Sequence, residues 1–325
     1  MRHAFLPPPP LQKKKRITTN IKMSIIIATV VYLAFLYAVR QRALPVIVLR
    51  VWFTLNVVTC VILSWALCGV LTLLYKNKVI RKETWHSLSR CVCACTFGGI
   101  MPFTCQHIHV EFLEGSLPWK EITRQHDLCL CHTSFFDTLL YLWYVPLQYI
   151  YTAKTFAKAS LRNLPLFGKV IVACGQYPVY FNSDAEGSFS VEKDKQAAVA
   201  EEVEQFLKEG GSLSFFPEGA LNKTPEVLKD FRLGSFKQVV AHKLPLYYIV
   251  TYGNHEVWNS KLKGIPGFPA DVSIYIGEYK YNPENADPVE IARGIREEMQ
   301  KHLDRMIALR AERKYVPWYK VNKTE

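Results

Sequence analysis

Acidic side chains are missing from the first 22 residues of this 325-residue chain, although six basic ones are present there. The six are Arg2, Lys13, Lys14, Lys15, Arg16 and Lys22. Half of the formal net charge of +12 therefore comes from a short, proline-containing tail. Because long apolar runs follow this tail directly, we interpret it as suited to an anionic membrane surface rather than to nucleic acid.

Cysteine pairs with the spacing of a zinc site or a redox motif are lacking as well. The chain has nine cysteines, and the densest group, Cys91, Cys93 and Cys95, alternates along the sequence. That is neither common zinc-finger spacing nor a pair separated by two residues. We therefore expect reduced, buried thiols on the cytosolic side and no metal site.

Charge is absent from two long stretches. Residues 23–39 form an uncharged run of 17 residues, and residues 51–75 form one of 25. As a helix the first is about 26 Å long and only just spans a hydrocarbon core of about 30 Å, whereas the second is long enough to span with tilt. Residues 23–75 are therefore predicted to form a pair of membrane helices or a membrane hairpin.

Three other interpretations of these runs were weighed. A re-entrant or in-plane arrangement in the membrane fits the same residues. Core helices of a soluble protein are disfavoured, because the second run is longer than an ordinary core helix. A cleaved signal peptide is disfavoured too, because no small-residue cleavage site follows the first run.

The basic residues around the two runs predict their orientation. Six precede the first run; the link carries Arg40, Arg42 and Arg50; and Lys76, Lys78, Arg81 and Lys82 follow the second run. The larger number at the two outer ends favours the cytoplasm for the tail, residues 1–22, and for the chain after residue 75.

Residues 76–325 have the mixed composition of a globular domain, which begins at about residues 76–85. Short apolar segments predict buried strands at residues 127–131, 212–217 and 245–250. A helix is predicted over residues 191–208, and alternation of strand with helix predicts an α/β domain.

An amphipathic helix is predicted at the C-terminal end of this domain. Asp287 is expected to cap it, with Pro288 at its first position and Glu290 completing a capping box. One apolar stripe on this helix consists of Ala292, Ile295, Met299, Leu303 and Met306.

A histidine and an aspartate lie five positions apart after the first predicted strand. His132 falls in the turn, and Asp137 falls at the start of an apolar helix over residues 138–144, so the carboxylate can fold back onto the imidazole. Such a carboxylate fixes the tautomer and supports the imidazolium that forms when the other nitrogen takes a proton. His132 would then be a general base for a hydroxyl that attacks an acyl group. The spacing alone is weak evidence, because it arises readily by chance.

Support comes from the tetrapeptide Phe216-Pro217-Glu218-Gly219, which follows the second predicted strand. Together with His132 and Asp137, it resembles the glycerolipid acyltransferase family, which includes the 1-acylglycerol-3-phosphate O-acyltransferases. Residues 157–168 and 243–250 are similar to two further blocks of that family, in the same order. The resemblance covers residues 127–253, about two fifths of the chain.

The resemblance implies a mixed sheet flanked by helices, at a membrane, with endoplasmic reticulum as the family's usual location. It implies transfer of a fatty acyl chain from acyl-CoA to a free hydroxyl of a glycerol-phosphate or lysophospholipid. Acyl-CoA is then a substrate, and neither a cofactor, a metal nor an acyl-enzyme is expected. The implied partners are membrane lipids and the two substrates, without nucleic acid.

Residue roles also follow from the resemblance. His132 would deprotonate the acceptor hydroxyl, and Asp137 would orient His132. Acceptor-binding positions carried over from the family are Phe216, Pro217, Glu218, Gly219 and Lys158.

The sequence departs from the family pattern at two places. Many phosphatidate-forming members continue the tetrapeptide with Thr-Arg, and a planar arginine can bind two phosphate oxygens, but here Ala220 and Leu221 follow. The second block commonly ends in arginine, where this chain has Asn182. Basic residues further along are expected to replace the lost charge, namely Lys223, Arg232 and Lys237.

The predicted reaction is lysophosphatidate plus acyl-CoA giving phosphatidate and CoA. A lysophospholipid acyltransferase or transacylase of phospholipid remodelling stays open, because the missing Thr-Arg permits it. A non-catalytic, lipid-binding membrane scaffold is the alternative from another class, and the retention of His132, Asp137 and Glu218 disfavours it. Sequons begin at Asn222 and Asn322, and they stay unglycosylated if the domain is cytoplasmic.

Overall fold

A seven-stranded sheet is the centre of the computed structural model, which describes residues 10–181, 191–261 and 264–318. The strand order is β1-β7-β6-β2-β5-β3-β4. Strands β6, β2, β5, β3 and β4 run parallel, β7 is antiparallel to β6, and β1 is parallel to β7. The bounds are β1 Ile108–Phe112, β2 Asp127–Leu130, β3 Ala153–Lys158, β4 Tyr177–Val179, β5 Ser212–Phe215, β6 Leu246–Tyr252 and β7 Ala270–Tyr279.

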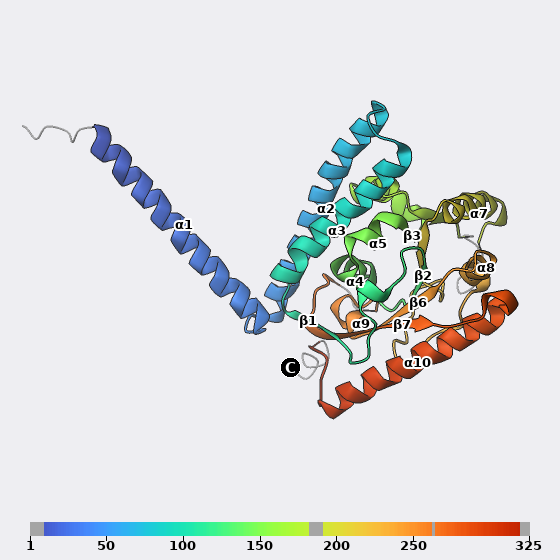
Figure 1. Ribbon diagram of the computed structural model, residues 1–325. Coiled ribbons are helices and arrows are strands. Elements are labelled where there is room, and N and C mark those ends of the chain that lie inside the picture. Colours follow the sequence, from blue (N-terminus) through green and yellow to red (C-terminus); the bar gives the residue numbers. More distant parts are fainter. Residues whose placement is uncertain (1–9, 182–190, 262–263, 319–325) are drawn as a thin grey trace, which may run out of the picture.

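Helices cover both faces of this sheet (Figure 1). Helices α3, α4 and α5 pack on one face, and α7, α8 and α10 pack on the other. The helix bounds are α1 Pro10–Arg40, α2 Val46–Lys76, α3 Lys82–Thr104, α4 Phe136–Tyr144, α5 Leu147–Thr152, α6 Phe167–Ala173, α7 Lys193–Lys208, α8 Leu233–Ala241, α9 Asn254–Val257 and α10 Pro288–Glu312. Short 3₁₀ turns lie at Trp119–Glu121, Ala159–Asn163 and Pro283–Asn285. The predicted mixed α/β sheet flanked by helices is confirmed.

The expected secondary structure is largely present. Strands β2, β5 and β6 coincide with the three predicted strands, and α7 coincides with the helix predicted over residues 191–208. The helix expected over residues 138–144 begins earlier, at Phe136, so Asp137 lies within the first turn of α4. This placement brings the Asp137 carboxylate close to the residues that precede the helix.

Helix α10, in the C-terminal region, packs against the sheet. All five residues of its predicted apolar stripe are buried against α8 and β6, which confirms the stripe. Asp287 caps the helix by accepting a hydrogen bond from the Val289 amide, 3.1 Å away, and Pro288 is its first residue. The capping box was wrong in one respect, since exposed Glu290 pairs with Arg293 three residues along the same helix.

The two apolar runs are longer helices than their uncharged stretches suggest. Helix α1 extends to Arg40 and α2 begins at Val46, so five residues join them instead of the eleven between the uncharged runs. Basic side chains such as Arg40 and Arg50 are good helix formers and do not end these helices. Two segments, Asn20–Arg40 and Val46–Lys76, are long and apolar enough to cross a bilayer, which is consistent with membrane association.

The two apolar helices differ in what they contact. Helix α1 projects from the rest of the molecule as an isolated rod, and the part whose hydropathy suits a membrane span is exposed (Figure 1). Helix α2 lies against α3 and buries one side along most of its length. Its buried residues are Leu49, Phe53, Asn56, Cys60, Ser64 and Cys68.

Candidate functional site

The carboxyl ends of four adjacent parallel strands carry the central residues of the candidate site. His132 follows β2, Phe216 follows β5, Lys158 is the last residue of β3, and Asn254 follows β6. Because these strands are ordered β6-β2-β5-β3 and run parallel, their carboxyl ends meet at one edge of the sheet. That edge is where ligands bind in open α/β sheets.

His132 and Asp137 are in direct contact at this edge. The Nδ1 atom of His132 lies 2.9 Å from Oδ2 of Asp137. The same oxygen accepts hydrogen bonds from the backbone amides of Thr133 and Ser134, each at 2.9 Å. The turn between β2 and α4 therefore folds the carboxylate back onto the imidazole, as the sequence predicts.

Asn254 donates a hydrogen bond to the other oxygen of the Asp137 carboxylate. Its Nδ2 donates to Asp137 Oδ1 and also to Thr133 Oγ1, 2.9 Å away. Asn254 is fully buried and begins α9, directly after Gly253. Gly253 has a φ of +94°, and a Cβ there would overlap the Asp271 carbonyl oxygen, so glycine is needed for the chain to turn here.

Sequence reasoning missed Asn254. A signal was available, because Asn254 comes soon after the predicted strand over residues 245–250, at the position where parallel strands present site residues. Its contact with Asp137, which lies 117 positions earlier, depends on β6 pairing with β2.

The hydrogen bonds around Asp137 define the protonation of His132. Because the Thr133 and Ser134 amides can only donate, Oδ2 of Asp137 is a hydrogen-bond acceptor. Nδ1 of His132 must then carry the proton that it shares with Asp137, which leaves Nε2 as the proton acceptor. The imidazole stacks on the Phe216 ring with 4.3 Å between centroids, and its side chain is 22% exposed, so it remains reachable from outside.

Glu218 joins the tetrapeptide to the His132 turn. Its buried carboxylate accepts hydrogen bonds from the His132 amide at 2.9 Å and from the Lys229 amide at 3.1 Å. Burial raises the pKa of Glu218, and the two amide donors act in the opposite direction. Glu218 therefore fixes the backbone on which His132 is held, a role that the sequence did not suggest.

The basic residues proposed from the sequence lie at different places. The Arg232 side chain packs against Gly219, where φ is +71° and a Cβ would overlap the guanidinium. The Arg232 amide also donates to the Pro217 carbonyl at 2.8 Å. Lys158, Lys223 and Lys237 are exposed, and among the described residues no hydrogen bond or ion pair joins them to the His132–Asp137 pair. Asn182, the other departure from the family pattern, lies outside the described residues.

A narrow, mainly apolar cavity opens beside Asp137. Tyr141 and Tyr144 of α4, Ile249 of β6 and Ile274 of β7 are among its lining residues. The cavity runs between the sheet and α4, behind the carboxylate.

Side chains next to His132 are not placed to act as nucleophiles. The Cys131 thiol is buried, and burial raises its pKa to about 12. Ser134 donates its hydroxyl to the Trp258 carbonyl at 3.0 Å and accepts from the Phe136 amide. Asn222, which heads one sequon, is also buried and donates to the Val227 carbonyl. Within the described residues, no group of three or more His, Cys, Asp or Glu side chains is arranged to hold a metal ion.

Comparison with known proteins places these residues in a family context. The family model described as "Acyltransferase" matches residues 128–252, which include His132, Asp137 and Glu218. The crystal structure of the 1-acyl-sn-glycerophosphate (LPA) acyltransferase PlsC from Thermotoga maritima has a similar fold, with a TM-score of 0.55 and 18% sequence identity. The similarity covers 83% of this chain and 98% of that one. No curated protein sequence matches the chain.

Replacement of Asn254 by alanine is expected to slow acyl transfer by roughly 10- to 100-fold, because a buried carboxylate oxygen left without its donor costs about 1–3 kcal/mol. The measurement is kcat beside the melting temperature of the purified protein. Asn259→Ala is the matched control, because Asn259 contacts Lys261 in the same segment. Wild-type kcat in the Asn254→Ala protein would show that Asn254 does not position Asp137.

Proposed function

We propose that the chain, whose residues 128–252 match the acyltransferase family model, transfers a fatty acyl chain from acyl-CoA to the free hydroxyl of 1-acylglycerol-3-phosphate. The observation that carries this proposal is the His132–Asp137 pair at the carboxyl edge of the sheet, bonded to Glu218 of the tetrapeptide. The similar fold of a 1-acyl-sn-glycerophosphate acyltransferase supports the choice of acceptor.

His132 acts as the general base in this reaction. As Nε2 takes the proton of the acceptor hydroxyl, the oxygen attacks the thioester carbonyl carbon of acyl-CoA. The imidazolium that forms is stabilised by the Asp137 carboxylate on Nδ1. A base within hydrogen-bond reach typically contributes about 10²–10⁴-fold to such a step.

The proposed reaction is complete without a cofactor or an acyl-enzyme. The tetrahedral intermediate expels the thiolate of CoA, so that one oxygen–carbon bond forms and one carbon–sulfur bond breaks. The proton held on His132 Nε2 passes to the departing sulfur, which restores the neutral imidazole. The Cys131 thiol is buried with a raised pKa, and the Ser134 hydroxyl donates to the Trp258 carbonyl. Direct attack by the acceptor hydroxyl is therefore the route that this site supports best.

Arg232 binds the acceptor phosphate in this proposal. Its side chain lies against Gly219, next to the position where other family members carry arginine. A guanidinium can bind two phosphate oxygens at once, which a lysine cannot match in geometry. Lys158, Lys223 and Lys237 remain candidates for weaker contacts with the acceptor or with CoA.

The membrane supplies the lipid acceptor and receives the product. The apolar helices α1 and α2 support an association with a membrane. In this proposal the membrane is that of the endoplasmic reticulum, and the catalytic domain faces the cytoplasm, where acyl-CoA is available.

An acyltransferase or transacylase of phospholipid remodelling is the second candidate. The observation that favours it is Ala220-Leu221 after the tetrapeptide, because neither side chain can bind a phosphomonoester. The phosphodiester of a lysophospholipid with a headgroup carries less negative charge than a phosphomonoester. Its binding therefore needs less positive charge from the protein.

An acceptor panel separates these functions. Purified protein in detergent, given labelled acyl-CoA, is expected to form product with lysophosphatidate but not with lysophospholipids that carry choline, ethanolamine, inositol or glycerol headgroups. His132→Ala should lower kcat by about 10²–10⁴-fold. His242→Ala is the matched control, since the His242 ring bonds Glu204 on α7. Product only from headgroup-bearing lysolipids would assign the chain to remodelling, and no His132-dependent product would contradict the proposed function.

Replacement of Arg232 by alanine is expected to raise the KM for lysophosphatidate about tenfold or more, since a hydrogen bond to a charged group contributes about 1.5–3 kcal/mol. The kcat should change little, because the phosphate is bound equally in the ground and transition states. Arg293→Ala, which removes an exposed arginine of α10, is the control. An unchanged KM would exclude Arg232 from the acceptor site.

A further inference from the structure

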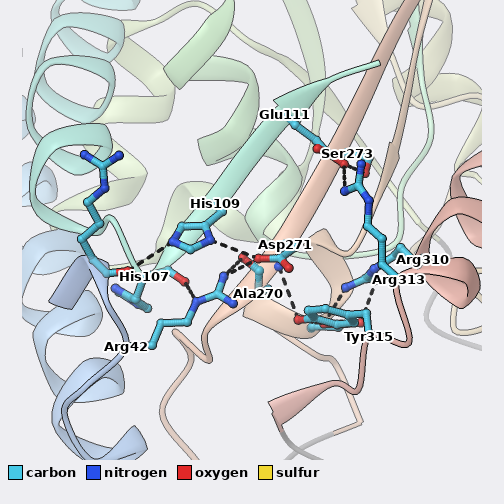
Figure 2. Close-up of polar contacts among 12 residues, drawn as sticks. Arg42, His107, His109, Glu111, Ala270, Asp271, Ser273, Arg310, Arg313 and Tyr315 are labelled. Atoms are coloured by element: carbon cyan, nitrogen blue, oxygen red, sulfur yellow. Dashed lines mark hydrogen bonds and ion pairs between the residues drawn. The ribbon is translucent and has the colours of Figure 1, made fainter. Parts of the chain in front are cut away.

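The short link between α1 and α2 is attached to the catalytic domain through Arg42. Its guanidinium donates to the His107 carbonyl at 2.9 Å and to the Ala270 carbonyl at 2.8 Å. It also pairs with Asp271 at 2.5 Å (Figure 2). These partners lie at the start of β1 and β7, at the edge of the sheet. The link therefore contacts the sheet directly, although it precedes β1 by more than 60 residues.

The contacts of Asp271 favour its charged form in the Arg42–Asp271 pair. Burial disfavours the charged form of Asp271, but His109 and Arg42 outweigh this effect and hold its pKa at about 2. His109 Nδ1 lies 3.3 Å from the Asp271 carboxylate (Figure 2). His109 Nε2 lies 3.2 Å from the Arg40 carbonyl. The attachment thus persists across the physiological pH range.

The first turns of α2 are bound to the same domain. Arg50 Nε donates to the Ile265 carbonyl at 2.9 Å, and its guanidinium lies 4.0 Å from the centre of the Phe268 ring. Phe53 is fully buried and packs edge-on against Phe136, the first residue of α4, with 5.9 Å between ring centroids.

The far end of α2 is bound as well. Trp85 of α3 donates its indole N–H to Thr72 at 3.2 Å and stacks on Tyr75 at 4.6 Å between centroids. Midway along the helix, Ser64 and Thr96 hydroxyls lie 2.6 Å apart. Helix α3 is in turn part of the catalytic domain, because its buried Arg90 donates to the Ile150 and Cys174 carbonyls.

A helix whose two ends are both fastened to one folded domain cannot carry the chain to the other side of a bilayer. To place the link on the far side, the Arg42 and Arg50 contacts would have to break and Phe53 would have to leave the core. Helix α1 is held at one end only: Val39 near its C-terminal end is buried, whereas residues 20–34 are exposed. At 1.5 Å per residue, its segment Asn20–Arg40 is about 31 Å long. That length matches a hydrocarbon core of about 30 Å.

We propose that α1 is the one segment of residues 10–76 that crosses the membrane, whereas α2 and the link stay on the side of the catalytic domain. The basic residues that precede Asn20 on α1 then lie on the opposite side from the site. This replaces the expectation from flanking charge that the tail and the catalytic domain share one side, and it is independent of the reaction proposed above.

The distribution of charge is compatible with this topology. If α2 does not cross, the basic residues at both of its ends count on the side of the catalytic domain. Seven then lie between positions 40 and 82, compared with six between positions 1 and 22. Flanking charge alone places the link and the residues after α2 on opposite sides of the membrane. That difference in charge no longer matters if α2 stays on one side.

Glycosylation mapping of the full chain tests this topology. A sequon-bearing extension is added either before Met1 or after Glu325, in a chain whose own sequons are removed by Asn222→Gln and Asn322→Gln. Microsomes should glycosylate one of the two extensions and leave the other without a glycan. The same state for both extensions would overturn the proposal, whichever side the catalytic domain faces.

A second measurement tests the attachment itself. Arg42→Ala should lower the melting temperature of the detergent-purified protein and open the link to protease, because three acceptors lose their donor. Arg40→Ala, which alters an exposed neighbouring arginine, should change neither. If Arg42→Ala also matched the wild type, the link would not be held by the domain and the proposed topology would lose its basis.

Discussion

Four hydrogen-bond donors converge on the carboxylate of Asp137, and the geometry of the site depends on them. His132 Nδ1 and the amides of Thr133 and Ser134 meet one oxygen, and Asn254 meets the other. These donors come from the β2–α4 turn and from the end of β6, so two adjacent parallel strands must be in register for the site to form. Glu218, after β5, adds a third strand by holding the His132 amide.

The local part of this arrangement could be predicted from the sequence, because it spans six residues. His132 and Asp137 meet through the turn that joins a buried strand to an apolar helix, and both elements have clear sequence patterns. The stripe of α10 was predictable for the same reason, since the helical period places Ile295, Met299 and Leu303 on one side.

The long-range part could not be predicted in this way. Asn254 lies 117 positions after Asp137, and Glu218 lies 86 positions after His132. Their contacts depend on strand order, which one sequence without an alignment does not reveal. Hydrophobicity has the same limit for α2, because it does not distinguish a side that faces lipid from one that packs on protein. Only three-dimensional contacts, such as those of Arg42 and Phe53, show that this part of the chain packs on protein.

The most direct test of the account is the kcat of Asp137→Asn, measured beside its KM values and melting temperature. An asparagine would keep the shape of the side chain but would lose the negative charge that stabilises the imidazolium through Nδ1, so His132 would become a much weaker base. We predict that kcat falls by roughly 10⁴-fold, as it does when a triad carboxylate is replaced, while KM and folding change little. A kcat within tenfold of the wild type, in a folded protein, would contradict the assignment of His132 as a base that Asp137 orients.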